Sequence, residues 1–113
     1  MATSPPENNP AYFGFADLHG FKDFVAEVVV CAPDIFIPMD WLGPDEQMNT
    51  DRAFVGLRYG LELTAREKGD LPLLQRCRTL VEEAYSHYKA GNENVGREKL
   101  LEMEKLLLTI PSE

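Results

Sequence analysis

The chain has 113 residues, of which 44% are hydrophobic and 27% charged, and its formal net charge at pH 7 is −8. This length suits one domain with one modest core, since domains cluster at roughly 100–150 residues. Two cysteines are too few for a disulfide-rich scaffold or a four-cysteine zinc site. The longest apolar run, 28–33, is far shorter than the roughly 20 residues of a membrane span. The acidic balance argues against nucleic acid as the main partner.

The first residues have the composition of a flexible arm. Residues 1–11 contain three prolines, which interrupt helix and strand alike, and they contain neither Lys nor Arg nor an apolar stretch. We therefore expect no secretory or transit signal, a cytoplasmic location, and a single helical domain over residues 12–113. In that setting Cys31 and Cys77 are expected to be buried, reduced thiols that pack as small hydrophobic groups.

Acidic residues are concentrated in the first half of the chain. Residues 1–50 hold eight acidic residues against one basic residue, a net charge of −7, whereas residues 51–113 hold eleven acidic and ten basic residues, a net charge of −1. Such an asymmetry indicates one acidic surface that would attract a basic partner. Solubility alone is the other explanation, because a net charge away from zero keeps small domains monomeric.

A first helix is predicted over residues 17–31. Asp17 is a suitable N-cap and Pro33 sets the end, although the β-branched run 28–30 leaves a strand as the competing interpretation. Apolar residues at helical spacing form one stripe: Leu18, Phe21, Phe24, Val25, Val28 and Val29. The aromatic residues that precede this helix are expected to fold back onto the core: Tyr12, Phe13 and Phe15.

Residues 34–48 interrupt the helical pattern. Pro38, Gly43 and Pro44 break any long regular element, yet the segment is rich in large apolar side chains. An apolar loop of about 15 residues is uncommon unless it is packed or functional, so we expect an ordered loop. It also carries four carboxylates, and we call it the acidic loop.

A second helix is predicted over residues 50–68, with Asn49 or Thr50 as its N-cap and Gly69 as its stop. It carries two apolar stripes, which is typical of a helix that is central in its bundle. These stripes are Phe54, Leu57, Leu61 and Ala65 on one side and Val55, Tyr59 and Leu63 on the other. Gly56 and Gly60 form a smooth strip, at a cost of about 1 kcal/mol each relative to Ala, that another helix or an aromatic ring can approach closely. We interpret this glycine strip as a sign of tight packing.

Two further helices follow after short connections. The third is predicted over residues 71–89, with Asp70 as its N-cap and Pro72 in its first turn, where proline is tolerated. The fourth is predicted over residues 94–109. Helices joined by short connections are antiparallel neighbours, so the chain is predicted to be all-α, a small four-helix bundle.

Part of this region resembles a known repeat. Tyr88, Gly91, Gly96 and Leu100 fall where the middle of a tetratricopeptide repeat has an aromatic residue, a turn glycine, a small residue and a large apolar residue. The resemblance covers only residues 84–103 and no second copy occurs, whereas such folds need about three units to bury a continuous core. We interpret it as convergent packing of a helix hairpin. The resemblance itself implies protein or peptide binding.

The sequence offers little for catalysis or metal binding. His19 and His87 lack neighbouring ligand residues, and no His-Glu-x-x-His, Cys-x-x-Cys or Glu-x-x-His pattern occurs. The glycine patterns that bind phosphate and the Gly-x-Ser-x-Gly turn are also absent. Cys77 and His87 lie ten residues apart on one predicted helix, about 15 Å at 1.5 Å per residue, too far for a nucleophile and its base. We expect no metal, no cofactor and no enzymatic activity.

Binding is the remaining class of function. The acidic loop combines apolar anchors with a charged rim, which is how interface hot spots are built and how a basic partner is attracted. Its candidate partner-binding residues are Asp34, Phe36, Asp40, Trp41, Leu42, Asp45 and Glu46. In the competing interpretation, the bundle's open end is merely plugged by Ile35, Ile37 and Trp41. Both interpretations hold if the apolar residues of the loop point inward and its carboxylates outward.

These observations lead to one main hypothesis and two alternatives. The main one is a small non-enzymatic adaptor or inhibitor, like an immunity protein or an antitoxin in size and charge, that docks a more basic protein through its acidic N-terminal half. The first alternative is a self-associating structural protein, joined through the glycine strip or through Leu101 and Leu108, which we expect to stay partly exposed. The second is a small enzyme or a ligand pocket lined by Tyr59, Tyr85, Tyr88 and Trp41. We expect neither nucleic acid nor a membrane as partner.

Overall fold

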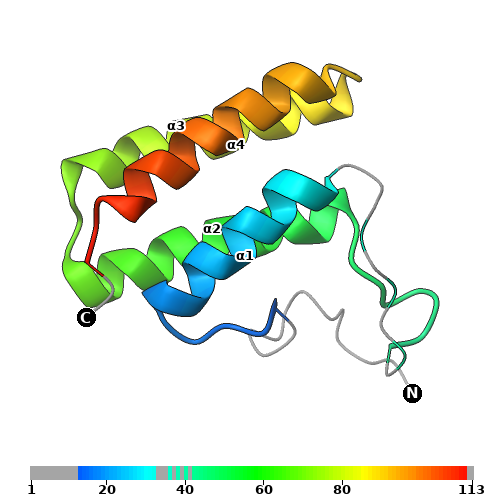
Figure 1. Cartoon of the computed structure of the whole chain (residues 1–113), viewed down its shortest axis with the longest axis horizontal. Helices are drawn as coiled ribbons and strands as arrows, with labels where there is room; N and C mark the ends of the chain where they lie inside the picture. Colours follow the sequence, from blue (N-terminus) through cyan, green and yellow to red (C-terminus); the bar gives the residue numbers. More distant parts are fainter. Residues whose placement is uncertain (1–12, 33–35, 37, 39, 41, 112–113) are drawn as a thin grey trace.

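The fold is known from a computed structural model that describes residues 13–32, 36, 38, 40 and 42–111. These residues form four helices and no strand (Figure 1): α1 (Leu18–Cys31), α2 (Thr50–Lys68), α3 (Pro72–Lys89) and α4 (Glu93–Leu108). The prediction of an all-α four-helix bundle is thus confirmed. The predicted arm, 1–11, lies outside the described residues. Over the part of the chain that is described, no helix combines the length and the apolar character that a membrane crossing requires.

The four helices form a ring in which each packs mainly against two neighbours, in the order α1, α2, α3, α4 and back to α1. In Figure 1, α1 lies in front of α2, and α4 lies in front of α3. The first and last helices run antiparallel, because Arg97 near the start of α4 donates from Nε to the Val29 carbonyl near the end of α1, at 3.2 Å. At the other end, the Lys22 ammonium group donates to the Ile110 carbonyl. Helices α1 and α4, remote in sequence, therefore share one face of the bundle.

The helix boundaries follow from capping groups that the sequence displays. Asp17 caps α1, since its Oδ1 accepts a hydrogen bond from the Gly20 amide at 2.9 Å. Asn49 caps α2 in the same way, by accepting from the Arg52 amide at 2.8 Å. Gly69 ends α2 with φ of +86°, a left-handed conformation that favours glycine. Side chains at these positions satisfy amides that have no partner within the helix.

The start of α3 corrects one prediction. Asp70 is not its N-cap: the helix begins at Pro72, and Leu71 occupies the N-cap position without a side-chain hydrogen bond. Proline suits the first helical position because its fixed φ fits the helix and its missing amide would have no partner there. Pro72 thereby sets the start one residue later than expected, and Asp70 accepts instead from Arg78 at 3.1 Å. Helix α4 begins one residue earlier than predicted, at Glu93.

Aromatic rings from the start of the chain close one side of the core. Phe13 and Phe15 are buried, which confirms that they fold back, whereas Tyr12 lies outside the described residues. The Phe13 ring lies 5.8 Å from that of Phe24, and the Phe15 ring lies 5.6 Å from that of Tyr59. Tyr59, the middle residue of the second apolar stripe of α2, is thus packed against the segment that precedes α1.

The glycine strip of α2 is filled by rings of α1. A Cβ at Gly60 would lie 2.0 Å from Phe21 Cδ1, and one at Gly56 would lie 2.7 Å from Phe24 Cζ. Both glycines are buried. Tight packing is confirmed, and self-association through this strip is wrong, because the chain's own side chains already occupy it.

Candidate protein-binding surface

The structure describes five of the seven residues predicted in the acidic loop; Asp34 and Trp41 lie outside the described residues. Phe36, predicted as an apolar anchor for a partner, is half-buried and packs against the core, whereas Ile35 and Ile37 of the plug interpretation lie outside the described residues. Leu42 is also half-buried. Asp40 and Asp45 are exposed. The described part of the loop therefore turns apolar groups inward and carboxylates outward.

The end of the loop is held by hydrogen bonds between side chains and the backbone. The Gly43 amide donates to Glu46 Oε1 at 2.9 Å, so this carboxylate has a structural role. The Arg52 guanidinium donates from Nη1 to the Gln47 carbonyl and from Nη2 to the Asp45 carbonyl, each at 2.6 Å. The Asp45 backbone is thus fixed to the first turn of α2 while its side chain stays in solvent.

The outward face of α1 carries two carboxylates and an apolar residue. Asp23 and Glu27 lie one turn apart, and both are exposed. Val30 lies on the same arc of the helix, about 20° from Asp23 at 100° per residue, and is 67% exposed. Within the described ranges, the side chains of Asp23, Glu27, Asp40 and Asp45 form no ion pair. Among the described residues, no basic side chain lies within ion-pair distance of these four carboxylates.

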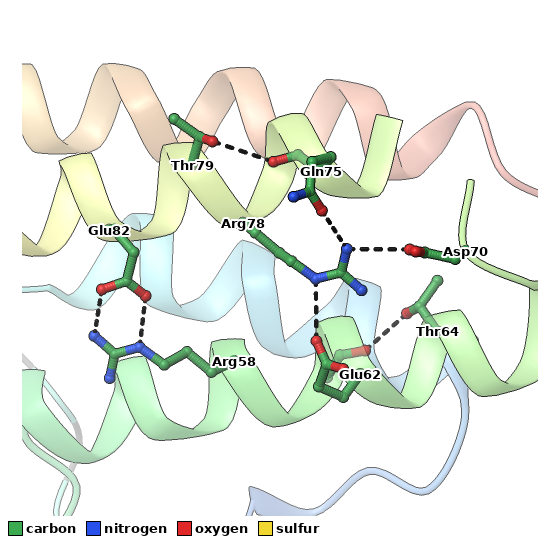
Figure 2. Close-up of polar contacts among 9 residues, drawn as sticks. Arg58, Glu62, Thr64, Asp70, Gln75, Arg78, Thr79 and Glu82 are labelled. Carbon is green, nitrogen blue, oxygen red and sulfur yellow. Dashed lines mark hydrogen bonds and ion pairs between the residues drawn. The ribbon is translucent and has the colours of Figure 1, made fainter. Parts of the chain in front are cut away.

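Carboxylates between α2 and α3 are paired instead (Figure 2). Arg58 donates to both oxygens of Glu82, at 2.7 and 3.0 Å. Arg78 donates to Glu62 and to Asp70, each at 3.1 Å. The hydrogen bond from Arg58, and then its charge, lowers the pKa of Glu82 below its usual value. The charges of these three acidic residues are thus paired with arginines of the same chain.

The remaining ion pairs continue this pattern. Asp51 accepts from the Tyr85 hydroxyl at 2.8 Å and from Lys89 at 3.3 Å. The hydrogen bond from Tyr85 is the largest reason why the pKa of Asp51 lies below its usual value. Two pairs join α3 to α4: Arg76 with Glu102 at 2.9 Å and Lys99 with Glu83 at 3.4 Å. At least five of the ten basic residues in the near-neutral half of the chain are thus paired with acidic residues of that half.

Two exposed apolar residues of α4 lie on the side of that helix that borders α1. Arg97, Leu101 and Leu108 lie on one side of α4, because they are four and seven residues apart. Since Arg97 reaches the α1 backbone, this side of α4 borders α1. Leu101 is 38% and Leu108 62% exposed, as expected.

The three described tyrosines that were proposed to line a pocket pack against phenylalanine rings. Tyr59 lies among Phe13 and Phe15, whereas Tyr85 and Tyr88 both lie against Phe54, at 5.2 and 5.9 Å between ring centroids. Trp41 lies outside the described residues. An open hollow of about 410 Å³ is lined by residues 91–95, at the turn between α3 and α4, and none of these tyrosines borders it.

The described residues contain neither a cluster of metal ligands nor a reactive thiol. In the portion of the chain with described coordinates, no three His, Cys, Asp or Glu side chains are grouped to hold a metal ion. Both cysteines are buried and unpaired, as expected, and burial raises the pKa of Cys77 to about 11. Such a thiol is protonated at neutral pH and is a poor nucleophile.

Comparison with protein-family models, with curated proteins and with solved structures finds no match to this chain. Sequence reasoning missed Val30 as an exposed residue of the candidate surface. A signal was present, because position 30 falls off the apolar stripe of α1 and onto the arc that carries Asp23 and Glu27. The pairing of α1 with α4, which brings Val30 toward Leu101, had no local signal.

Proposed function

We propose that this protein is a non-enzymatic binding module that docks a more basic protein through its acidic N-terminal half. The observation that carries the proposal is that some carboxylates of the chain are paired with basic side chains and others are not. The acidic residues between α2 and α3 are neutralised by arginines, whereas Asp23, Glu27, Asp40 and Asp45 find no cation within the described residues. Exposed carboxylates that are not paired within the chain accelerate encounter with a cationic surface.

The proposal predicts a binding reaction that weakens as salt increases, because exposed charges are screened beyond roughly 8 Å at physiological ionic strength. The test uses capture from lysate of the organism's cells, at low and at moderate salt, with mass spectrometry as readout. The wild-type protein is compared with Asp40→Asn/Asp45→Asn. Both aspartate side chains are exposed, so the change removes charge and leaves the core intact.

The matched control is Thr79→Lys/Ser86→Lys. It changes the net charge by the same amount, but at two exposed positions of α3. We expect one dominant basic protein with wild type and control, and a several-fold loss with the loop variant. Once that protein is purified, stopped-flow kinetics should place most of the difference in the association rate. Equal capture by both variants, or no salt-sensitive capture by the wild type, would contradict the proposal.

A further inference from the structure

Two exposed leucines lie on one line along α4. Leu101 and Leu108 are separated by two helical turns, and around the helix axis they differ by only about 20° at 100° per residue. Both are exposed, whereas the residues that α4 buries lie on a different side of the helix. Helix α4 therefore offers two apolar contacts seven residues apart, which is the repeat by which paired helices join.

Charged residues of opposite sign follow each other on both flanks of this line. On one flank lie Glu98 and then Lys105, about 60° and 40° from Leu101 around the helix. On the other flank, which borders α1, Arg97 comes first and Glu104 second, about 40° and 60° from Leu101. These four charges sum to zero, although the whole chain carries −8. The charges on this face of α4 therefore do not by themselves repel a second copy.

The four charged side chains are available to a neighbouring molecule. Among the described residues, Glu98, Glu104 and Lys105 form no ion pair. Glu98 and Lys105 are exposed, and Glu104 is half-buried. Arg97 donates to two carbonyls of α1, but these hydrogen bonds use only two of its five N–H groups.

A second copy of α4 matches this face when the two helices run parallel. About a two-fold axis along the helices, Leu101 meets Leu101 of the second copy and Leu108 meets its Leu108. Each flank of one helix then faces the other flank of the second helix, so each acidic side chain lies level with a basic one. The resulting pairs, each formed twice, are Glu98 with Arg97 and Lys105 with Glu104.

An antiparallel copy does not achieve both matches. If Leu101 lies against Leu108 of the second copy, Lys105 meets Lys105 and Glu104 meets Glu104, and like charges repel. If the second copy is shifted until the charges match, Leu108 lies level with the polar side chain of Asn94. The apolar contacts and the charges are therefore satisfied together only in the parallel pairing.

We propose that the protein forms a parallel, two-fold symmetric dimer through the exposed face of α4, with Leu101 and Leu108 at its centre. This dimer goes beyond the proposed function, since it uses residues other than those of the acidic loop. The contact consists of one helix face from each copy, so we expect monomer and dimer to exchange in solution.

The first test is analytical ultracentrifugation of the full chain over roughly a hundredfold range of concentration, because the dimer fraction rises with concentration. Leu101→Gln/Leu108→Gln should weaken the dimer roughly tenfold or more, since it removes both apolar contacts. Val95→Gln is the matched control, because Val95 is exposed to the same extent as Leu101 (39% and 38%) but lies about 120° away around α4. Circular dichroism checks that all variants fold.

A charge exchange tests the pairing of the flanks. Lys105→Glu places two carboxylates opposite each other and should weaken the dimer several-fold. Addition of Glu104→Lys restores the pair with its signs exchanged and also restores the net charge of the chain. The double variant should therefore dimerise like the wild type.

Disulfide formation tests the orientation. In the parallel dimer, Leu101→Cys and Leu108→Cys each place a cysteine against its counterpart, so each variant should cross-link with itself on oxidation. The wild type should not cross-link, because both of its thiols are buried. In the antiparallel pairing of Leu101 with Leu108, the two copies of either cysteine lie about 10.5 Å apart along the helix axis, whereas a disulfide spans at most about 7 Å between Cα atoms.

Several results would overturn the proposal. These are a monomer at every concentration, an equal loss of dimer with Val95→Gln, and no recovery of the dimer in the charge exchange. Cross-linking only in a mixture of the two cysteine variants would contradict the parallel pairing. The proposed function fails separately, in the lysate experiment with Asp40→Asn/Asp45→Asn.

Discussion

Replacing Gly60 by alanine tests the packing that holds α1 against α2. In an exposed helix this change stabilises by about 1 kcal/mol, because glycine has the greater backbone freedom to lose. At Gly60 the new Cβ would lie 2.0 Å from both Cδ1 and Cε1 of Phe21, whereas carbon atoms in contact are normally about 3.5–4.0 Å apart. The Phe21 ring would therefore have to retreat by roughly 1.5 Å.

The core leaves no space into which the Phe21 ring could move. Phe21 is fully buried, and the ring centroid of Phe15 lies 5.3 Å from its own. Overpacking of a core costs about 1–3 kcal/mol, and a clash this deep belongs at the upper end. After the gain of about 1 kcal/mol in helix propensity, the expected net loss is about 2 kcal/mol. For a domain of this size that is a fall in Tm of roughly 8 °C.

The assay is urea unfolding followed by circular dichroism, in a double-mutant cycle with Phe21→Leu. The smaller leucine makes room for the alanine, so Phe21→Leu should be much less damaging in the Gly60→Ala background than in the wild type. Stabilisation by Gly60→Ala alone, or strict additivity of the two changes, would refute the account of a ring seated on a glycine.

Three further predictions concern charge, burial and capping. The folded pKa of Asp51 lies below its usual value of 3.8, so the stability that this carboxylate contributes is present above that value and is lost as pH falls through the lowered pKa. The variant Asp51→Asn should therefore be less stable than the wild type at neutral pH and should lose less stability on acidification. Urea titrations from neutral pH to about pH 3 measure both effects. The Cys77 thiol, with its pKa raised to about 11 by burial, should react with a thiol reagent at neutral pH only after unfolding, and Cys77→Ser should cost about 1–3 kcal/mol through an unpaired hydroxyl. Arg97→Gln removes the guanidinium that donates to the Val29 and Ala32 carbonyls; it should cost about 1–3 kcal/mol and speed amide exchange in the last turn of α1 ahead of other helices.

The helices could be predicted to within one residue because their limits are encoded locally. Asp17, Asn49 and Gly69 act through their own side chain or backbone on residues within one turn, which is the range that a sequence pattern reports. Asp70 was misassigned because two local signals compete at that point. An acidic residue and a proline both mark a helix start, and the proline at position 72 determines it.

The candidate surface could be predicted only in part. The exposure of Leu101 and Leu108 followed from their positions on the flank of a helix. Their proximity to α1 could not be predicted, because no sequence pattern indicates that residues 93–108 pack against residues 18–31. The contact between Arg97 and the end of α1 spans 68 positions in sequence, and long-range pairing of that kind is decided by packing of the whole bundle. The binding roles of the acidic loop remain predictions.

The antiparallel contact of α1 with α4 also has a consequence for synthesis of the protein on the ribosome. The carbonyls at the end of α1 receive their hydrogen bonds from a residue that is translated 68 positions later. At about 5–20 residues per second, that interval lasts roughly 3–14 s. During this time the apolar stripe of α1 can pack on α2 but not on α4, so the apolar surface that α4 later buries is still exposed. The nascent chain is therefore expected to be most vulnerable to aggregation and to need chaperone protection until α4 has left the exit tunnel.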